Sequence, residues 1–213
     1  MGAIDLGRFL QRYKPDTSLG APRTQAAKAG SPQDAPAGVD VTVAEVLSQI
    51  GGMSFNNGLY RTHRLEDVPA WNKTIATAWN ETAGKVTVFA YDWGGAQYAL
   101  YKQDTVFQFS AGDLEFVNIP ADVASFHNEI LMEHPSEAAA AEFYKAWLES
   151  GGAVPRYDTC IGYQKPLFLG GTDWIENLEL IDLDVYWTVT APIIARARKV
   201  GVGGKIGKIE IGE

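Results

Sequence analysis

Cysteine and histidine are residue types that often supply a nucleophile and its general base. The chain has one cysteine, Cys160, and three histidines, His63, His127 and His134. No nucleophile motif surrounds Cys160, and isolated cysteines are usually small buried apolar side chains. The four residues also lack the spacing of a zinc site. The sequence therefore predicts no catalytic residues, no metal site and no cofactor.

The glycine-rich segment GVGGKIGK, residues 201–208, contains residue types that cradle phosphate groups. Ile206 stands where a dinucleotide loop needs its third glycine, and the spacing before Gly207 does not fit a Walker loop. Carboxylate pairs of the kind that hydrolases use are abundant, but an acidic chain supplies them by chance. Neither pattern predicts a nucleotide site or a hydrolase.

Residues 173–184 form an acidic segment without a cation. Its carboxylates are Asp173, Glu176, Glu179, Asp182 and Asp184. Apolar residues, Trp174 and Leu180 among them, alternate with these carboxylates, so we expect one face to enter the core and the other to present negative charge. Two interpretations stay open from the residues alone. The segment is either a solvated face with Asp182 as a helix cap, or a surface that fills the cationic groove of a nuclease.

The composition is that of a folded, acidic protein. The chain has 213 residues, 46% of them hydrophobic, and a net charge of −8, which disfavours stable binding to nucleic acid or anionic membrane. Residues 196–213 carry +3, so the remainder carries −11. A lone cysteine and the lack of an apolar run long enough for a signal peptide or a membrane span predict a cytoplasmic protein.

Helical periodicity predicts a first helix over 4–13, and Pro, Gly and Ala then predict a mobile loop at about 15–38. Thr42 and Glu45 have capping-box spacing before a helix that ends at Gly51. Asp67 can cap the next helix, in which Trp71, Ile75 and Trp79 lie on one stripe. Four runs rich in β-branched and aromatic residues, KVTVFAYDW, AQYALY, TVFQFS and LEFVNI, predict an antiparallel meander.

Two further helices are expected near 122–133 and 136–150, followed by an irregular glycine-rich stretch. Asp182 can cap a final helix that bends at Pro192. The basic glycine-rich tail from Arg196 is either a hairpin or frayed. The predicted fold class is α+β, with an antiparallel β-meander flanked by helices and two closely packed subdomains.

From Cys160 onward, CIGYQKPLFLGGTDWIENLELIDLDVYW resembles the carboxyl-terminal domain of type VI secretion DNase-immunity proteins. GGMSFNNGLYRTH, FAYDWGGAQYAL and IPADVASFHNE are similar to the GAD-like amino-terminal domain of the same proteins and its junction. The resemblance implies a GAD-like domain at 1–119 and an immunity domain at 120–213. Its motif residues, which we expect to have structural roles, are Cys160, Gly162, Tyr163, Pro166, Gly170, Gly171, Asp182 and Trp187.

The resemblance also implies an antitoxin-like function: binding and inhibition of a cognate bacterial toxin, in particular a secreted DNase, without catalysis. The candidate toxin-binding residues are Asp173, Glu176, Glu179 and Asp184. The alternative function is a ligand-sensing or transcription-regulatory module. A basic surface assembled from Arg61, Arg64 and Lys73 would favour that alternative.

Overall fold

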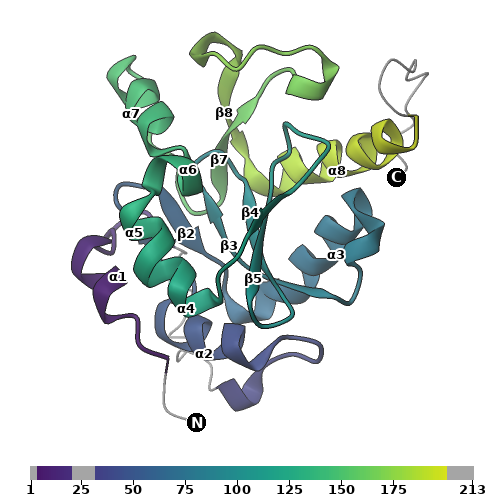
Figure 1. The fold of residues 1–213 in the computed structure, drawn as a ribbon. Coiled ribbons are helices and arrows are strands. Elements are labelled where there is room, and N and C mark those ends of the chain that lie inside the picture. Colours follow the sequence, from purple (N-terminus) through teal and green to yellow (C-terminus); the bar gives the residue numbers. More distant parts are fainter. Residues whose placement is uncertain (1–3, 21–31, 201–213) are drawn as a thin grey trace.

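The computed structural model describes residues 4–20 and 32–200 (Figure 1). Its centre is an antiparallel sheet in which each of six strands pairs with the next along the chain. The strands are β1 (Ser54–Phe55), β2 (Tyr60–Thr62), β3 (Val86–Asp92), β4 (Gln97–Tyr101), β5 (Thr105–Phe109) and β6 (Val117–Ile119). The predicted α+β class and the meander of the last four strands are confirmed. The sequence did not predict β1 and β2, which join at Asn57-Gly58.

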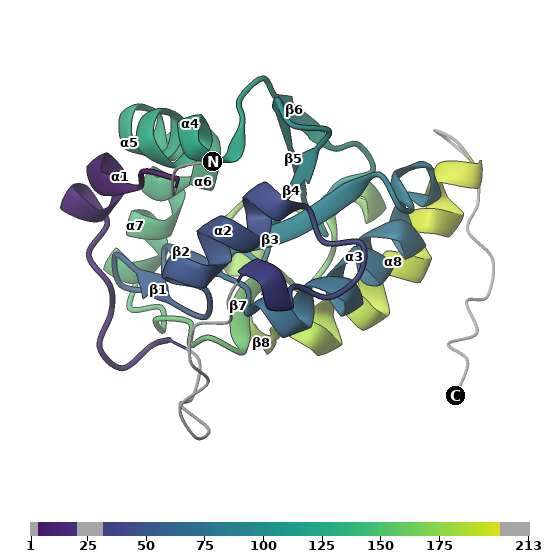
Figure 2. The ribbon, with the colours of Figure 1, turned by 90° about the horizontal axis from the view of Figure 1, so that it is seen from below.

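Helices cover both faces of the sheet, which explains why every residue of β3 is buried. Helices α3 (Val68–Ala78) and α8 (Leu183–Val200) lie side by side on one face (Figures 1 and 2). Helices α1 (Gly7–Arg12) and α2 (Val41–Ile50) belong to the hydrophobic cluster of the other face. Both clusters contain residues from before and after position 120, so the two parts of the chain are closely packed.

The cap of α2 differs from the prediction. The N-cap is Asp40, whose Oδ1 accepts a hydrogen bond from Thr42 N at 2.7 Å, instead of Thr42 itself. The helix begins earlier because Asp40 already meets an orphan donor of the first turn. Asp67 does occupy the N-cap position of α3, but its side chain makes no capping hydrogen bond.

The segment after the meander is more broken than predicted. Helix α4 (Val123–Ser125), a π-helical turn at Phe126–Ile130 and α5 (Leu131–Glu133) replace the first expected helix. The second is divided into α6 (Pro135–Ala139) and α7 (Ala141–Glu149). The division falls at Ala140, whose φ of 46° lies in the left-handed region that a right-handed helix cannot contain.

The stretch expected to be irregular contains a β-hairpin. Strands β7 (Thr159–Tyr163) and β8 (Leu178–Asp182) pair with each other and form a separate two-stranded sheet. Helix α8 follows directly, and Asp182 Oδ1 accepts a hydrogen bond from Val185 N at 2.9 Å. The predicted cap at Asp182 is therefore confirmed, and Pro192 lies inside the helix as expected.

At its two described ends, the segment predicted to be a mobile loop contacts the rest of the fold. Pro15 forms a β-bridge with Phe55, and the Asp16 carboxylate accepts hydrogen bonds from Ser54 Oγ and from the backbone N–H groups of residues 57 and 58. Pro32–Asp34 form a 3₁₀ turn, after which Ala35 and Val39 pack against the core. Residues 21–31 of that loop, and residues 201–213 of the basic tail, lie outside the described residues.

Within the described residues, no helix has the length and apolar character needed to span a membrane. Several buried ionisable groups have strongly shifted pKa values, among them two histidines and one aspartate. Burial lowers the pKa of His63 to about 3 and that of His127 to about 4, because the imidazolium form would lose its hydration. His63 Nε2 is hydrogen-bonded to Gln97 Oε1, which raises the pKa of His63 but by less than burial lowers it, and His127 Nε2 is hydrogen-bonded to the Tyr60 hydroxyl. Burial raises the pKa of Asp92 to about 6, although Ala96 N and the Tyr98 hydroxyl donate to its carboxylate.

These shifts predict how stability depends on pH. Between about pH 4 and 6 the folded protein keeps a proton on Asp92 that the unfolded chain has lost, so ionised Asp92 costs stability above pH 6. Asp92→Asn removes that cost. The free energy of unfolding of the variant minus that of wild type should therefore increase by up to about 3 kcal/mol as the pH rises from 4 to 7. Urea denaturation of both proteins at several pH values measures the difference, and a pH-independent difference would contradict the prediction.

Candidate functional site

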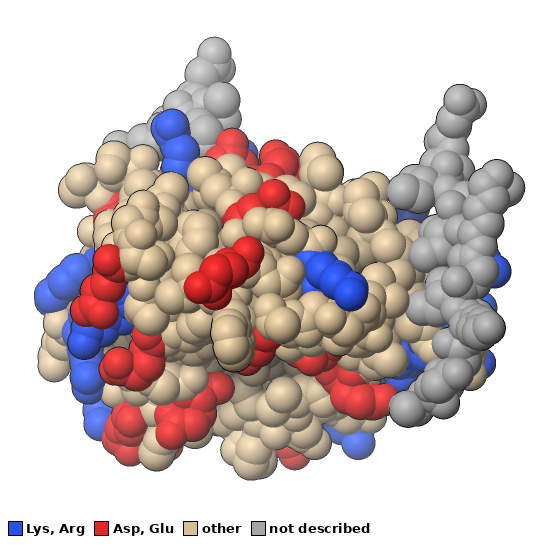
Figure 3. All heavy atoms as spheres, turned by 90° about the horizontal axis from the view of Figure 1, so that it is seen from above, with Lys and Arg blue, Asp and Glu red and all other residues tan. Residues whose placement is uncertain are grey.

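All five carboxylates of the acidic segment are exposed, but they come from three different elements. Asp173 and Glu176 lie in the loop that joins β7 to β8, and Glu179 lies on β8. Asp182 and Asp184 lie at the start of α8, where negative charge interacts favourably with the helix dipole. The face of the molecule at this end of the hairpin carries carboxylates across its centre and Lys and Arg mainly toward its edges (Figure 3).

The apolar residues of this segment do not all enter the core. Leu178 and Leu183 are buried, as expected. Trp174 is 69% exposed and Leu180 is 46% exposed, although the alternating pattern predicted that both would be buried. Trp174 lies in the loop, outside the strand, and Leu180 lies on β8 but belongs to neither hydrophobic cluster of the described residues. The segment thus presents apolar and acidic side chains together.

The loop of residues 164–177 is fixed by Asn177, a residue of the segment that carries the resemblance but one to which the sequence assigned no role. The Asn177 side chain donates to the carbonyls of Lys165 and Thr172 at 2.8 Å each and accepts from Lys165 N at 3.0 Å. Its backbone N–H donates to Trp174 O at 3.0 Å. These bonds join the two ends of the loop to its middle. The loop is therefore held in one conformation, with Trp174 displayed on it.

The motif residues in this loop explain its shape. Gly170 has a φ of 81°, a conformation that glycine adopts without strain. A Cβ atom at Gly171 would lie 1.9 Å from the Lys165 carbonyl oxygen and 2.8 Å from Asn177 Nδ2. The Pro166 carbonyl accepts hydrogen bonds from the N–H groups of Leu169 and Gly171 at 3.0 Å each. These contacts agree with the structural roles expected for Pro166, Gly170 and Gly171.

Gly171→Ala is accordingly expected to destabilise the protein by roughly 1–3 kcal/mol, because overpacking forces the backbone to shift. Thermal unfolding measures the loss. Gly84→Ala is a useful comparison, since it tests the backbone cost alone: a Cβ there meets nothing within 4 Å, although φ is 67°. A Gly171→Ala protein as stable as wild type would show that the loop adjusts freely.

Tyr163 connects the loop to the meander. Its hydroxyl donates a hydrogen bond to Asp173 Oδ1. Its ring packs against Gly112 so closely that a Cβ atom on that glycine would lie 2.8 Å from the ring. Burial raises the pKa of Tyr163, and the hydrogen bond to the Asp173 carboxylate raises it further. The tyrosine therefore stays protonated and fixes the direction of the Asp173 carboxylate.

The remaining motif residues join the hairpin to the meander. A Cβ at Gly95, whose φ is 82°, would lie 2.9 Å from Cys160 Sγ, and Trp187 Nε1 donates to Gly95 O at 2.8 Å. Gly162 packs in the same way under the ring of Tyr186. Cys160 is fully buried, and burial raises its pKa to about 12. A buried thiol of that pKa is unsuited to nucleophilic chemistry.

Arg61 does not belong to a basic surface. It is fully buried, and its guanidinium donates to the carbonyls of Arg156 and Thr159 at 2.5 Å each and to that of Asp92 at 2.7 Å. The guanidinium also lies 4.5 Å from the centre of the Tyr91 ring. Arg61 therefore joins the meander to the segment before β7. The surface expected from Arg61, Arg64 and Lys73 is not formed.

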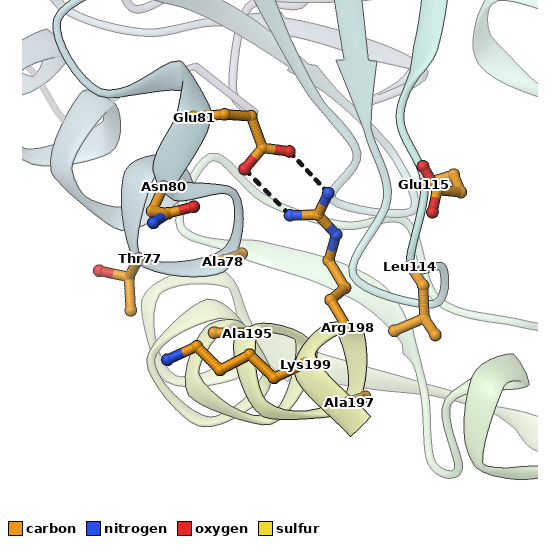
Figure 4. A pocket seen from close by; sticks show the side chains of 10 residues that line it. All are labelled: Thr77, Ala78, Asn80, Glu81, Leu114, Glu115, Ala195, Ala197, Arg198 and Lys199. Atoms are coloured by element: carbon orange, nitrogen blue, oxygen red, sulfur yellow. Dashed lines mark hydrogen bonds and ion pairs between the residues drawn. The ribbon is translucent and has the colours of Figure 1, made fainter. Parts of the chain in front are cut away.

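Two of the hollows in the described surface lie beside α8 or the hairpin. One, of about 390 Å³, lies between α3, α8 and residues 114–115. Figure 4 shows Glu81 and Arg198 turned toward each other in it, and Arg198 donates to both Glu81 oxygens at 2.6 and 3.1 Å. Arg198 belongs to the basic tail, so part of the tail's charge is neutralised within the fold. The other, of about 200 Å³, lies between the meander, α7 and the hairpin.

Across residues 4–20 and 32–200, no three His, Cys, Asp or Glu residues converge as metal ligands.

Known proteins share the fold of this chain and, over part of its length, its sequence pattern. The fold is similar to the crystal structure of Atu4351 from Agrobacterium tumefaciens, with a TM-score of 0.53 and 12% sequence identity over 88% of this chain and 89% of that chain. No curated protein matches the chain. Residues 122–193, about one third of the chain, match the family model of the type VI secretion system (T6SS) immunity protein Tdi1, carboxyl-terminal domain. The hairpin, its loop and most of α8 are thus similar to part of a type VI secretion immunity protein.

Proposed function

We propose that this protein is an immunity protein that binds and inhibits a cognate bacterial toxin. The observation that carries the proposal is the family match over residues 122–193, which contains the whole exposed acidic segment. Inhibition by direct binding needs a partner surface and no catalytic residues. The burial of Cys160 and the neutral, buried His63 and His127 agree with such a role.

The proposal extends to the nature of the toxin. A nuclease must attract the phosphates of nucleic acid, so its substrate groove carries positive charge. Exposed carboxylates on three adjoining elements, in a chain of net charge −8, are complementary to such a groove. A secreted DNase that acts in the cytoplasm is the toxin class that we infer. The division into a GAD-like part, 1–119, and an immunity part, 120–213, belongs to the same proposal.

The test is to produce this protein together with the toxin encoded beside its gene. We expect a bacterial host that dies from the active toxin to survive when this protein is present. We also expect a stoichiometric complex with a catalytically inactive form of that toxin in light scattering. Absence of both a complex and protection would overturn the immunity function.

The DNase identity is tested separately with purified toxin and plasmid DNA. One equivalent of this protein should stop the cleavage. If the toxin leaves DNA intact but is still neutralised in the host, the immunity function stands and the DNase assignment falls.

A further inference from the structure

Trp174 lies in the loop between β7 and β8 and belongs to neither hydrophobic cluster of the described residues. Its 69% exposure is the largest among the exposed large hydrophobic residues of the described chain. An exposed indole leaves in water a large apolar area that is favourable to bury. Interfaces concentrate their binding free energy in such residues, Trp and Arg above all.

The loop presents Trp174 in a prearranged way. Asn177 closes the loop through its side chain, and its backbone N–H donates to Trp174 O. Gly171 permits the close approach to Lys165 that this closure needs. An anchor that is already ordered loses little conformational entropy on binding, which favours affinity.

Two exposed carboxylates lie within two residues of Trp174 in the same loop. Asp173 precedes the tryptophan, and its direction is fixed by the Tyr163 hydroxyl; Glu176 lies in the 3₁₀ turn that follows Trp174. A loop that exposes both an aromatic ring and carboxylates suits a guanidinium, which can stack on aromatic rings and form ion pairs with carboxylates. The same chain already stacks Arg61 on Tyr91, at 4.5 Å.

From these observations we infer that Trp174 is the anchor of the toxin interface and receives an arginine side chain from a cationic surface of the toxin. This inference rests on the proposed immunity function and adds the contact residue and its chemistry. Charge complementarity favours a cationic side chain of the toxin over nucleic acid and over a second copy of this chain. Nucleic acid would meet like charge at Asp173 and Glu176, and a second copy of this chain would bring the same carboxylates against them.

The test compares the affinities of three variants for the inactive toxin encoded beside the gene. Trp174→Ala should weaken binding by about 30-fold or more, the range of an interface hot spot. Trp174→Phe keeps a ring for stacking and should lose less. Val117→Ala is the matched control, because Val117 is also exposed, at 56%, but lies on β6. All three should keep the melting temperature of wild type to within a few degrees, because surface changes have small effects.

The outcomes separate this inference from the proposed function. If wild type binds the toxin and Trp174→Ala binds equally well, the anchor is wrong and the immunity function stands. If wild type does not bind the toxin, the function itself fails. Dimerisation of wild type alone that Trp174→Ala abolishes would also overturn the inference, because the indole would then serve a second copy of this chain.

Discussion

Arg61→Ala is expected to lower the free energy of unfolding by at least about 3 kcal/mol, the range seen when one partner of a buried charged interaction is removed. The side chain is fully buried and bonds three backbone carbonyls, those of Asp92, Arg156 and Thr159. Removing it leaves those buried acceptors without their donor and leaves a cavity against Tyr91. Urea denaturation followed by circular dichroism measures the loss.

Arg61→Lys should not restore this stability, because an ammonium group cannot reproduce the planar fork that reaches three carbonyls. Lys73→Ala is the matched control, since Lys73 is an exposed cation on α3. It should change the free energy of unfolding by no more than about 0.5 kcal/mol. If Arg61→Ala were as mild as Lys73→Ala, the contacts between the meander and residues 156–159 would not depend on the arginine.

The sequence predicted the elements whose pattern is local. The last four strands of the meander have continuous β-branched and aromatic runs, and in β3 and β4 nearly every residue is buried because helices cover both faces of the sheet. Strands β1 and β2 have two and three residues, too few to show a period. In the β7–β8 hairpin, exposed Glu179 and Leu180 are neighbours, so its outer strand does not alternate between buried and exposed residues.

For the candidate site, the sequence predicted the exposure of the carboxylates but not the positions of all the apolar residues between them. Exposure of the carboxylates follows from the cost of burying charge, which needs no knowledge of the fold. The opposite inference failed for Trp174 and Leu180, because an apolar side chain can stay exposed where no element covers it. The inference from charge to exposure failed for Arg61, whose burial depends on carbonyls about 95 residues away along the chain. Asn177 acts through backbone groups, which leave no pattern in a sequence.

Removing charge from the acidic segment is expected to weaken toxin binding strongly without unfolding the protein. The variant Asp173→Asn, Glu176→Gln, Glu179→Gln keeps side-chain size, and the amide oxygen introduced by Asp173→Asn can still accept the hydrogen bond of the Tyr163 hydroxyl. Close charge pairs across an inhibitor interface couple by roughly 1.5–7 kcal/mol, whereas exposed ion pairs within one protein contribute about 0–1 kcal/mol. Affinity should therefore fall by at least about tenfold, while the melting temperature stays nearly unchanged.

The matched control removes the same net charge elsewhere, through Asp34→Asn, Glu66→Gln and Asp104→Asn, which are exposed on other elements. Both triple variants have a net charge of −5 in place of −8, so long-range attraction between the two proteins weakens in both. If the toxin contacts the acidic segment directly, the acidic-segment variant should bind the toxin more weakly than the control variant does. The segment variant should also associate more slowly and show a flatter dependence of affinity on salt, because fewer charge pairs remain to be screened. Equal losses in the two variants would mean that net charge alone attracts the toxin and would move the binding surface away from the hairpin loop.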